Sequence, residues 1–530
     1  MKRYLLPLFL IVALLSSSVA LAVVDPAPED VLASYAQDPA KDYSVSISGW
    51  TAGPVDNDNA PVLDLVEEVT GLRVVFDNID GQQYNDLINV RLASGDAPDV
   101  FSLSPHATMT KFFDQGIIRT IREDVLAALA PDFYNLYMSE APQALDIVRL
   151  AEDPNQLIAI PQYKFHAQFV YPFVWNMKWL KAVGIDKVPD NLEEFEAAVY
   201  KFAKEDPDGN GIDDTYGLSV SGFMAVYGAH GLAKAKWLEL EDGTLGFSAV
   251  QPGMKDALAK LAQWYADGII DPDFVKGDSA ENYGGRGDLT SAFLTDRIGV
   301  SVHGDYWTWC EEVPIGLNYQ EFIKTHAPED LAIAPPILAN DGVSRNTSRA
   351  TVTQNTFWCF NVDLPDDDLA MFLKVLDWEY GSMENYRTSW YGIEGEHWDW
   401  DEDGLSQPLG DYALDKGLQN KIGAYTTLGA IIEPFEYQAG VRGNLAKWAN
   451  ELDLGDPTFT KYGLLDKLLV TPPSYNIYWD ELTKLLNETI IDIVTGVQPI
   501  DYFDTFVDEW TKSGGGIITE EASAWYATLK

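Results

Sequence analysis

A stretch in the middle of the chain is spaced to bind a hard cation. Residues 206–214 read DPDGNGIDD, so side-chain oxygens stand at the first, third, fifth and ninth positions. Gly at the sixth position permits a sharp turn, and the seventh residue offers its carbonyl, as in a helix-flanked calcium loop. We therefore predict a structural calcium ion, whose expected ligands are Asp206, Asp208, Asn210, Ile212 and Asp214.

This loop departs from the full calcium motif at its twelfth position. Gly217 stands where the motif has a bidentate Glu, so Thr215 or a water would have to complete the shell. The alternative is an acidic Asp-Gly turn that binds no ion. A second acidic run, DWDEDG at 399–404, begins similarly but has Gln407 at its ninth position, and there a solvated hairpin turn is favoured.

Aromatic side chains are abundant and often stand at the ends of expected strands or in loops. The chain has 16 Trp, 26 Tyr and 23 Phe. About half are expected in ordinary core, since large aromatics are mostly buried. The alternative is a platform for sugar rings, whose C–H faces lie on Trp or Tyr while carboxylates and amides bind the hydroxyls. The candidates are Trp50, Trp175, Trp307, Trp309, Trp358, Trp390, Tyr391, Trp398 and Trp400, with Glu394, Glu396, Glu433 and Gln438 nearby.

The charge balance excludes some partners. Lys+Arg 36 against Asp+Glu 82 gives a formal net charge of -46 over 530 residues. Nucleic acids and anionic membrane surfaces are disfavoured, because both are bound mainly through Lys and Arg. The 46% hydrophobic content argues against disorder, and the length allows two or three domains.

The N-terminus has the pattern of a secretory signal peptide. Lys2 and Arg3 precede an apolar run over 5–15 and small residues at 20–22, so cleavage is expected after residue 22. The alternative, an uncleaved membrane anchor, is disfavoured because the apolar run is too short to span a bilayer. We expect a periplasmic or extracellular protein without a lipid anchor, since no Cys lies near the cut. Cys310 and Cys359 could pair or remain buried thiols.

Strands and helices alternate along the chain after a leader over 23–42, rich in Ala, Pro and Asp, which we expect to be flexible. Such alternation predicts an α/β fold with a mainly parallel sheet. The last third is mostly helical. Strands are expected at 43–50, 72–79, 98–104, 169–176, 297–304 and 356–362, and helices at 61–70, 82–93, 177–183, 192–205, 253–267, 365–380, 480–495 and 499–512.

Several stretches resemble one family. Residues 92–104, 173–202 and 264–274 are similar to the extracellular solute-binding proteins (family 1) that serve ABC sugar importers. Residues 391–404 and 495–515 resemble its longer, lipoprotein-like oligosaccharide-binding branch. The calcium loop resembles that of the alginate-binding members, in which it is structural. The matches keep the family's order over nearly the whole mature chain.

The resemblance implies a two-lobed periplasmic-binding-protein-like fold (type II, cluster D-like), with hinge crossovers and a helical C-terminal third. Lobe 1 is expected at 43–165 plus about 340–390. Lobe 2 is expected at 166–339 plus about 391–530, including the calcium loop. The ligand would be enclosed between the lobes by hinge closure.

The resemblance also implies a function. It predicts a monomeric, non-catalytic receptor that delivers an oligosaccharide to ABC permease subunits. Trp307 falls where maltose-type binders place a stacking Trp, the helix around Tyr478 and Trp479 would reach the cleft, and Trp390, Tyr391 and Glu394 would line it. The predicted ligand-binding residues are Trp50, Trp175, Trp307, Trp309, Trp390, Tyr391, Glu394 and Trp479.

Two other functions remain open at this point. A secreted glycoside hydrolase also needs carboxylates and Trp platforms, but no Gly-x-Ser-x-Gly, His-Glu-x-x-His or Gly-rich phosphate motif occurs. A calcium-dependent adhesion protein would be expected to repeat its units, and no repeat is found. The sugar is not identified, and Lys164, Lys178 and Arg387 are the candidates for binding a uronate.

Overall fold

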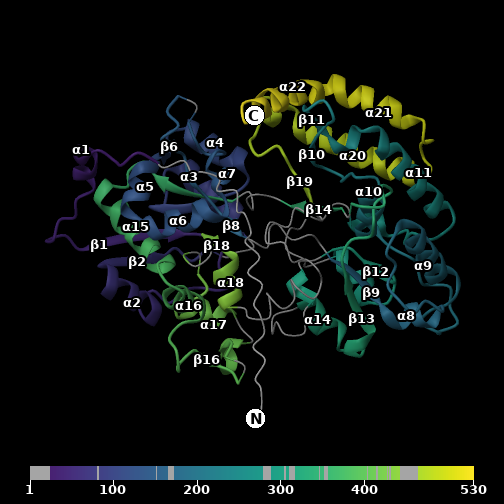
Figure 1. The fold of residues 1–530 in the computed structure, drawn as a ribbon, viewed down its shortest axis with the longest axis horizontal. Coiled ribbons are helices and arrows are strands. Elements are labelled where there is room, and N and C mark those ends of the chain that lie inside the picture. The colour runs from purple at the N-terminus through teal and green to yellow at the C-terminus, as the bar shows by residue number, and fades with distance from the viewer. Residues whose placement is uncertain are drawn as a thin grey trace, which may run out of the picture.

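The computed structural model describes residues 24–79, 83–150, 152–164, 172–277, 288–303, 306–309, 317–344, 346–350, 356–402, 404–413, 416–426, 428, 431–441 and 463–530. The predicted signal peptide over 1–22 and Cys310 lie outside the described residues. Two lobes lie side by side in Figure 1, each with a sheet, covering helices and its own hydrophobic core.

The first lobe is built on a six-stranded sheet in the order β2-β1-β3-β15-β4, with β7 also paired to β15. β1, β2 and β3 are parallel, and β15 runs antiparallel to its neighbours. Period-two alternation buries Tyr43, Val45 and Ile47 of β1. The strands are β1 Tyr43–Ser48, β2 Leu72–Phe76, β3 Val100–Leu103, β4 Ile118–Arg119, β7 Ile160–Pro161 and β15 Phe357–Asn361.

Helices and short strands complete this lobe. The helices are α2 Pro61–Thr70, α3 Tyr84–Ser94, α4 His106–Asp114, α5 Glu123–Leu129, α6 Pro131–Glu140, α7 Pro142–Leu145, α15 Asp366–Tyr380, α16 Met383–Tyr391, α17 Lys416–Lys421 and α18 Phe435–Val441. The short strands are β5 Ile121–Arg122, β6 Gln156–Leu157, β8 Tyr163–Lys164, β16 Trp398–Trp400, β17 Ser406–Pro408 and β18 Ile432–Glu433.

The boundary of the first lobe differs from the predicted one. Leu428, Ile431, Ile432 and Val441 are buried in the first core, together with Trp390. The prediction placed 391–530 entirely in the second lobe, so its 391–441 portion was assigned wrongly. The physical reason is that β18 pairs with β8, and α16 packs on α18.

The segment predicted as a flexible leader is folded over 24–42. It forms α1 (Glu29–Leu32) and a 3-10 helix (Ala33–Tyr35) that packs on α15. Tyr35 is buried, and Lys41 pairs with Asp367 at 2.8 Å and Asp368 at 2.7 Å. The prediction of flexibility is therefore wrong for these residues.

The second lobe has a three-stranded antiparallel sheet in which β9 lies between β12 and β13. Asn191 caps α9 as its side chain accepts a hydrogen bond from the Glu194 N–H at 3.0 Å. The strands are β9 Phe173–Asn176, β12 Val300–Ser301 and β13 Leu331–Ala334, with a hairpin of β10 Trp237–Glu239 and β11 Leu245–Phe247. The helices are α8 Met177–Ala182, α9 Leu192–Lys204, α10 Phe223–Ala229, α11 Pro252–Ala266, α12 Phe274–Gly277, α13 Asp288–Leu294, α14 Leu317–Phe322, α20 Tyr475–Val494, α21 Tyr502–Trp510 and α22 Gly516–Ala527.

The predicted helical C-terminal region is confirmed, and it belongs to the second lobe. Figure 1 shows α20, α21 and α22 over β10 and β11. Leu482, Leu486 and Trp510 are buried in the second core. In the described part of the chain, no helix has both the length and the apolarity needed to cross a membrane.

The chain passes between the two cores three times, as expected for hinge crossovers. It leaves the first core after β8 and enters the second at β9, returns between β13 and β15, and leaves again between α18 and α20. The later two passages pair with each other, because β14 (Thr347–Ala350) runs parallel to β19 (Gly463–Leu465). In Figure 1 this pair lies between the lobes.

Candidate functional site

One edge of the first sheet faces the crossovers. Ser48 at the end of β1 pairs with Phe101 of β3, and Leu103 at the end of β3 pairs with Phe357, the first residue of β15. Phe357 also pairs with Pro161 of β7, which leads into the first crossover. The carboxyl ends of β1 and β3 therefore lie at the edge where the chain passes between lobes. Ligands of open α/β sheets bind outside such carboxyl ends.

Trp50 stands at this edge, two residues beyond β1, and 46% of its surface is exposed. Its loop is fixed by a residue distant in sequence. The backbone N–H groups of Ala52 and Gly53 donate to Oδ1 of the fully buried Asn420, at 2.7 and 3.0 Å. Gly53 approaches the chain so closely that a Cβ there would lie 2.9 Å from Gly417 Cα. The exposed indole is thus presented on a rigid loop.

His106 connects the same edge to the third crossover. The Thr471 N–H donates to His106 Nδ1 at 3.3 Å, so the neutral ring carries its proton on Nε2, which lies 3.2 Å from the Ile147 carbonyl oxygen. Thr471 Oγ1 is 3.2 Å from Nδ1. Burial lowers the pKa of His106, which favours the neutral form that this contact needs.

The sheet of the second lobe also turns one end toward the crossovers. Ser301 at the end of β12 pairs with Val174, and Ala334 at the end of β13 pairs with Phe173, where β9 begins after the first crossover. A 3-10 helix, Tyr306–Trp309, follows β12 at this end. The backbone of Trp307 lies in this 3-10 helix, while its side chain lies outside the described atoms, so its role stays a prediction.

Four of the predicted ligand residues pack against the hydrophobic cores. Trp175 is fully buried in β9, edge-on to Phe195 at 5.4 Å. Trp309 is 1% exposed and donates from Nε1 to the His303 carbonyl at 3.0 Å. Both predictions are wrong for this structure, because a ring closed inside a core has no free face for a sugar.

The other two lie on α16. Trp390 is buried, with the Tyr425 ring edge-on at 4.9 Å, and Tyr391 is half-buried and donates to the Val441 carbonyl. Consecutive side chains on a helix point about 100° apart. Both of these side chains pack against the first core, on which α16 lies beside α18. The buried Trp390 has no free face for a ligand, so that prediction is also wrong for this structure, whereas the role of the half-buried Tyr391 stays a prediction.

Glu394 is exposed, as expected of a ligand-binding group, and it contacts Trp400, a candidate platform that was not among the predicted ligand-binding residues. Its Oε1 accepts a hydrogen bond from Trp400 Nε1 at 3.0 Å. The guanidinium of Arg387 lies 4.5 Å from the Trp400 ring centroid and 5.2 Å from that of Trp398. Trp398 is buried, whereas Trp400 is 43% exposed. Strand alternation places residues that are two apart on the same face, so it could not predict that Trp398 is buried while Trp400 is exposed.

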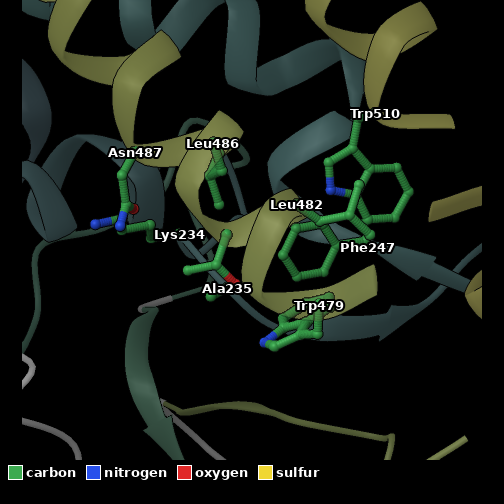
Figure 2. Close-up of a pocket in the computed structure, with 9 residues that line it drawn as sticks. Lys234, Ala235, Phe247, Trp479, Leu482, Leu486, Asn487 and Trp510 are labelled. Carbon is green, nitrogen blue, oxygen red and sulfur yellow. The ribbon is translucent and has the colours of Figure 1, made fainter. Parts of the chain in front are cut away.

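Trp479 is half-buried in the second lobe, and the Tyr475 ring is stacked on it at 4.4 Å. One face of its indole is therefore covered. Its other surroundings include Phe247, edge-on at 5.2 Å, and a small pocket drawn in Figure 2. Tyr478 points elsewhere and packs against Gly514, where a Cβ would meet its ring at 2.3 Å.

The predicted calcium ligands converge in a tight loop after α9. The Asn210 amide donates to Asp208 Oδ2 at 2.7 Å and to Asp214 Oδ1 at 3.2 Å, and the Gly211 N–H donates to Asp206 Oδ2 at 3.0 Å. Gly211 has a φ of 76°, the left-handed turn expected at the sixth position. Burial and the neighbouring carboxylates raise the pKa of Asp208, while the hydrogen bond from Asp208 lowers that of Asp206.

The twelfth position of this loop, Gly217, is packed closely against residues of the second core. A Cβ on Gly217 would lie 2.6 Å from Val199, so no Glu fits there. The Thr215 hydroxyl is buried and donates to the Phe202 carbonyl at 2.9 Å. Among the described residues, no group of three or more His, Cys, Asp or Glu side chains is arranged to hold a metal ion. In the loop over 206–214, the Asn210 amide lies between the carboxylates of Asp208 and Asp214.

The second acidic run forms the expected hairpin. β16 pairs antiparallel with β17, and Asp401 accepts from the Leu405 N–H at 2.8 Å and from the Gln407 amide at 3.3 Å. Asp401 is thus occupied by contacts within the turn. Cys359 is a buried free thiol in β15.

Comparison with known proteins supports this architecture. Residues 19–352 match the family described as bacterial extracellular solute-binding protein. The chain is 29% identical over 235 residues to lipoprotein LipO of Bacillus subtilis, a match that covers 42% of this chain and 44% of LipO. It is 22% identical over 481 residues to the polygalacturonan/rhamnogalacturonan-binding protein YtcQ of the same organism, covering 86% of each.

The fold is also found in a solved structure. The ABC-transporter substrate-binding protein FusA of S. pneumoniae, an EF-hand mutant in complex with fructo-nystose, superposes with a TM-score of 0.65 at 16% identity. That superposition covers 92% of this chain and 99% of FusA. With the family match over more than half of the sequence, the chain belongs to the bacterial extracellular solute-binding proteins.

Proposed function

We propose that this protein is a receptor that encloses an oligosaccharide between its two lobes and delivers it to an ABC importer. The observation that carries the proposal is Trp50, an exposed indole on a fixed loop at the carboxyl ends of parallel strands that face the crossovers. The names of YtcQ and of the FusA complex favour a carbohydrate over a peptide. The net charge of -46 repels an anionic ligand at long range, where salt screens the repulsion. Whether a uronate binds is therefore decided by Lys and Arg side chains close to the bound sugar.

Within this proposal the first lobe supplies the primary contact. Trp50 stacks on a sugar ring, and Trp307 approaches from the second lobe. Trp400, held by Glu394 and Arg387, is a second platform on the first lobe. Trp175, Trp309 and Trp390 are buried and support the fold.

Titration of intrinsic Trp fluorescence with neutral fructo- and gluco-oligosaccharides and with oligogalacturonides tests the function. Saturable binding to at least one of these, with lobe closure seen by small-angle scattering, is expected. Binding only to peptides or other solutes would contradict the proposal. Chromatography of the recovered sugar separates a receptor from a glycoside hydrolase, because a receptor returns it uncleaved.

We further propose that the loop over 206–214 binds calcium as a structural ion. The Asn210 amide nitrogen lies 2.7 Å from Asp208 Oδ2 and 3.2 Å from Asp214 Oδ1, so rotation of the amide and of the Asp206 carboxylate would be needed to bring the ligand oxygens together. Asp206, Asp208, Asn210, Asp214 and the Ile212 carbonyl would hold the ion. Calorimetric titration with Ca²⁺ is the test, and heats equal to those of an Asp214→Asn variant would contradict it.

The mature protein is proposed to act as a monomer outside the cytoplasm without a lipid anchor. Mass spectrometry of the exported chain should give an N-terminus near residue 23 with no added lipid mass. Light scattering should give the mass of a single chain. A lipid-modified product or a stable dimer would require revision of this part.

A further inference from the structure

The segment between β19 and α20, residues 466–475, forms a strap that is attached to both lobes. Its first part is tied to the second lobe, because the Lys467 N–H donates to the Trp237 carbonyl at 2.9 Å. Its last part returns to that lobe through Ser474, whose N–H and hydroxyl donate to the Glu521 carboxylate at 2.9 and 2.7 Å. In Figure 1 the strap is the yellow segment that leads from β19 to α20.

The middle of the strap lies on the first lobe. Leu469 packs against the first core, while Leu468 before it and Tyr475 after it pack against the second. The Thr471 N–H donates to Nδ1 of His106 in the first lobe at 3.3 Å, and Thr471 Oγ1 lies 3.2 Å from the same atom. This contact therefore joins the first lobe to a segment that the second lobe holds on both sides.

His106 accepts this hydrogen bond only while its ring is neutral. Its Nε2 lies 3.2 Å from the Ile147 carbonyl oxygen, so the one proton of the neutral ring is on Nε2 and the lone pair is on Nδ1. Protonation places a second N–H on Nδ1, which then faces the N–H of Thr471. The Thr471 hydroxyl can turn a lone pair toward the new N–H, but a backbone N–H cannot accept. Acid therefore makes the backbone contact repulsive.

The groups packed around the ring do not offset that change. The ring contacts the residues around Ile147, β15 and the strap, and it stands on α4. The titratable or charged residues that come nearest along these four segments are Lys111, Asp146, Arg149, Cys359 and Lys467. Asp146 and Arg149 pair with each other at 2.7 Å, and burial raises the pKa of the Cys359 thiol, which stays neutral. Among the described residues, burial lowers the pKa of His106 and the Ile147 carbonyl raises it, without a contribution from a carboxylate.

We propose that His106 and Thr471 form an acid-sensitive latch between the two lobes. With a neutral ring, the latch fixes the strap, and with it the second lobe, to the edge of the first sheet. Because burial lowers the pKa of His106 below its ordinary value of 6.5, the latch is complete above that pH and is lost as the pH falls through the lowered value. Its loss leaves the lobes free to take a wider range of separations. The inference concerns the hinge and holds whichever solute the protein binds.

Histidine ¹⁵N NMR of the full chain tests the protonation state that the latch needs. The sequence has 6 His, and the His106 signals would be identified by their loss in His106→Asn. At neutral pH the ring is expected to carry its proton on Nε2 and to titrate below pH 6.5. A proton on Nδ1, or titration at or above pH 6.5, would overturn the latch, because the Thr471 N–H would then lack its acceptor at neutral pH.

Hydrogen exchange and small-angle scattering of the ligand-free protein test the contact itself. As the pH falls through the midpoint of the His106 titration, the protection factor of the Thr471 amide, corrected for the intrinsic pH dependence of exchange, should fall about tenfold. The radius of gyration should change over the same range.

His106→Asn is the matched control, because the Asn oxygen can accept from the Thr471 N–H and does not titrate. Both quantities should therefore stay constant in this variant. An equal response in His106→Asn would assign the change to other titrating groups, such as surface carboxylates, and would overturn the latch. Constant protection of the Thr471 amide in the parent would overturn it as well.

Thr471→Val separates the backbone N–H from the hydroxyl, and it is the second variant if His106→Asn does not fold. It keeps the N–H from which the neutral ring accepts and removes the oxygen to which the protonated ring can donate. The pH response should therefore persist, with its midpoint at a lower pH. Loss of the response would assign the sensing to the hydroxyl, and an unmoved midpoint would show that the ring does not face Thr471. Either result would overturn the latch.

Discussion

Replacement of Trp50 by Ala is expected to weaken oligosaccharide binding about tenfold without changing the fold. A Trp side chain presents roughly 250 Å² of surface, of which 46% is exposed here, or about 115 Å². A sugar ring on one face would cover about half of that, roughly 60 Å². At ~25 cal/mol per Å², the lost burial is about 1.5 kcal/mol, which corresponds to a tenfold change in Kd.

Isothermal titration calorimetry of the Trp50→Ala variant would measure this change with the tightest-binding sugar of the fluorescence panel. Trp525→Ala, which removes a half-buried Trp on α22, is the matched control and should leave Kd unchanged. Circular dichroism and thermal melting would confirm that both variants fold. An unaltered Kd for a folded Trp50→Ala protein would refute the assignment of the first sheet edge as the sugar platform.

Three further outcomes are expected. Calcium at 100 times its Kd should raise the melting temperature of the second lobe by about 5 °C above the value measured with a chelator, as followed by differential scanning calorimetry. The increase should be lost in Asp206→Asn and kept in Asp401→Asn. Burial raises the pKa of the 1% exposed Glu379 to about 8, so between pH 5 and 7 the folded state keeps a proton that the unfolded state releases. The contribution of Glu379 to stability should therefore fall by about 1.4 kcal/mol per pH unit as the pH rises through this range, so the free energy of unfolding in urea should depend less steeply on pH in Glu379→Gln than in the parent. Asn420→Ala should destabilise the first lobe by about 2–4 kcal/mol in urea unfolding, because two backbone N–H groups lose their acceptor, and a loss below 0.5 kcal/mol would contradict the role given to Asn420.

The regular elements were largely predictable because their signals are local. The helix predicted at 61–70 is α2, bounded by Pro61 and Gly71, and Asn191 caps α9 as its position indicated. Strand alternation identified β1 and β2, although the structure ends each strand before its predicted limit. The acidic loop over 206–214 was recognised from spacing alone, and in the structure the Asn210 amide contacts both Asp208 and Asp214.

The candidate site was less predictable because its geometry depends on contacts between distant segments. Nothing near Trp50 in the sequence shows that Asn420, 367 residues from Gly53, holds its loop. The composition of 390–400 likewise cannot show that Trp390 faces the core while Trp400 is exposed. The limit of the first lobe was missed for the same reason, since β18 joins that lobe by pairing with β8.

The interleaving of the two cores has a consequence for how the chain is synthesised. The first core includes residues up to Val441 and the second includes residues up to Ala522, so the second core can close only when nearly the whole chain has been made. Phe247 packs against Trp510, whose ring lies parallel to it at 5.2 Å and which follows it by about half the sequence. A chain of this topology stays open through most of its translation, which keeps it in a form that can be threaded through a membrane before it folds.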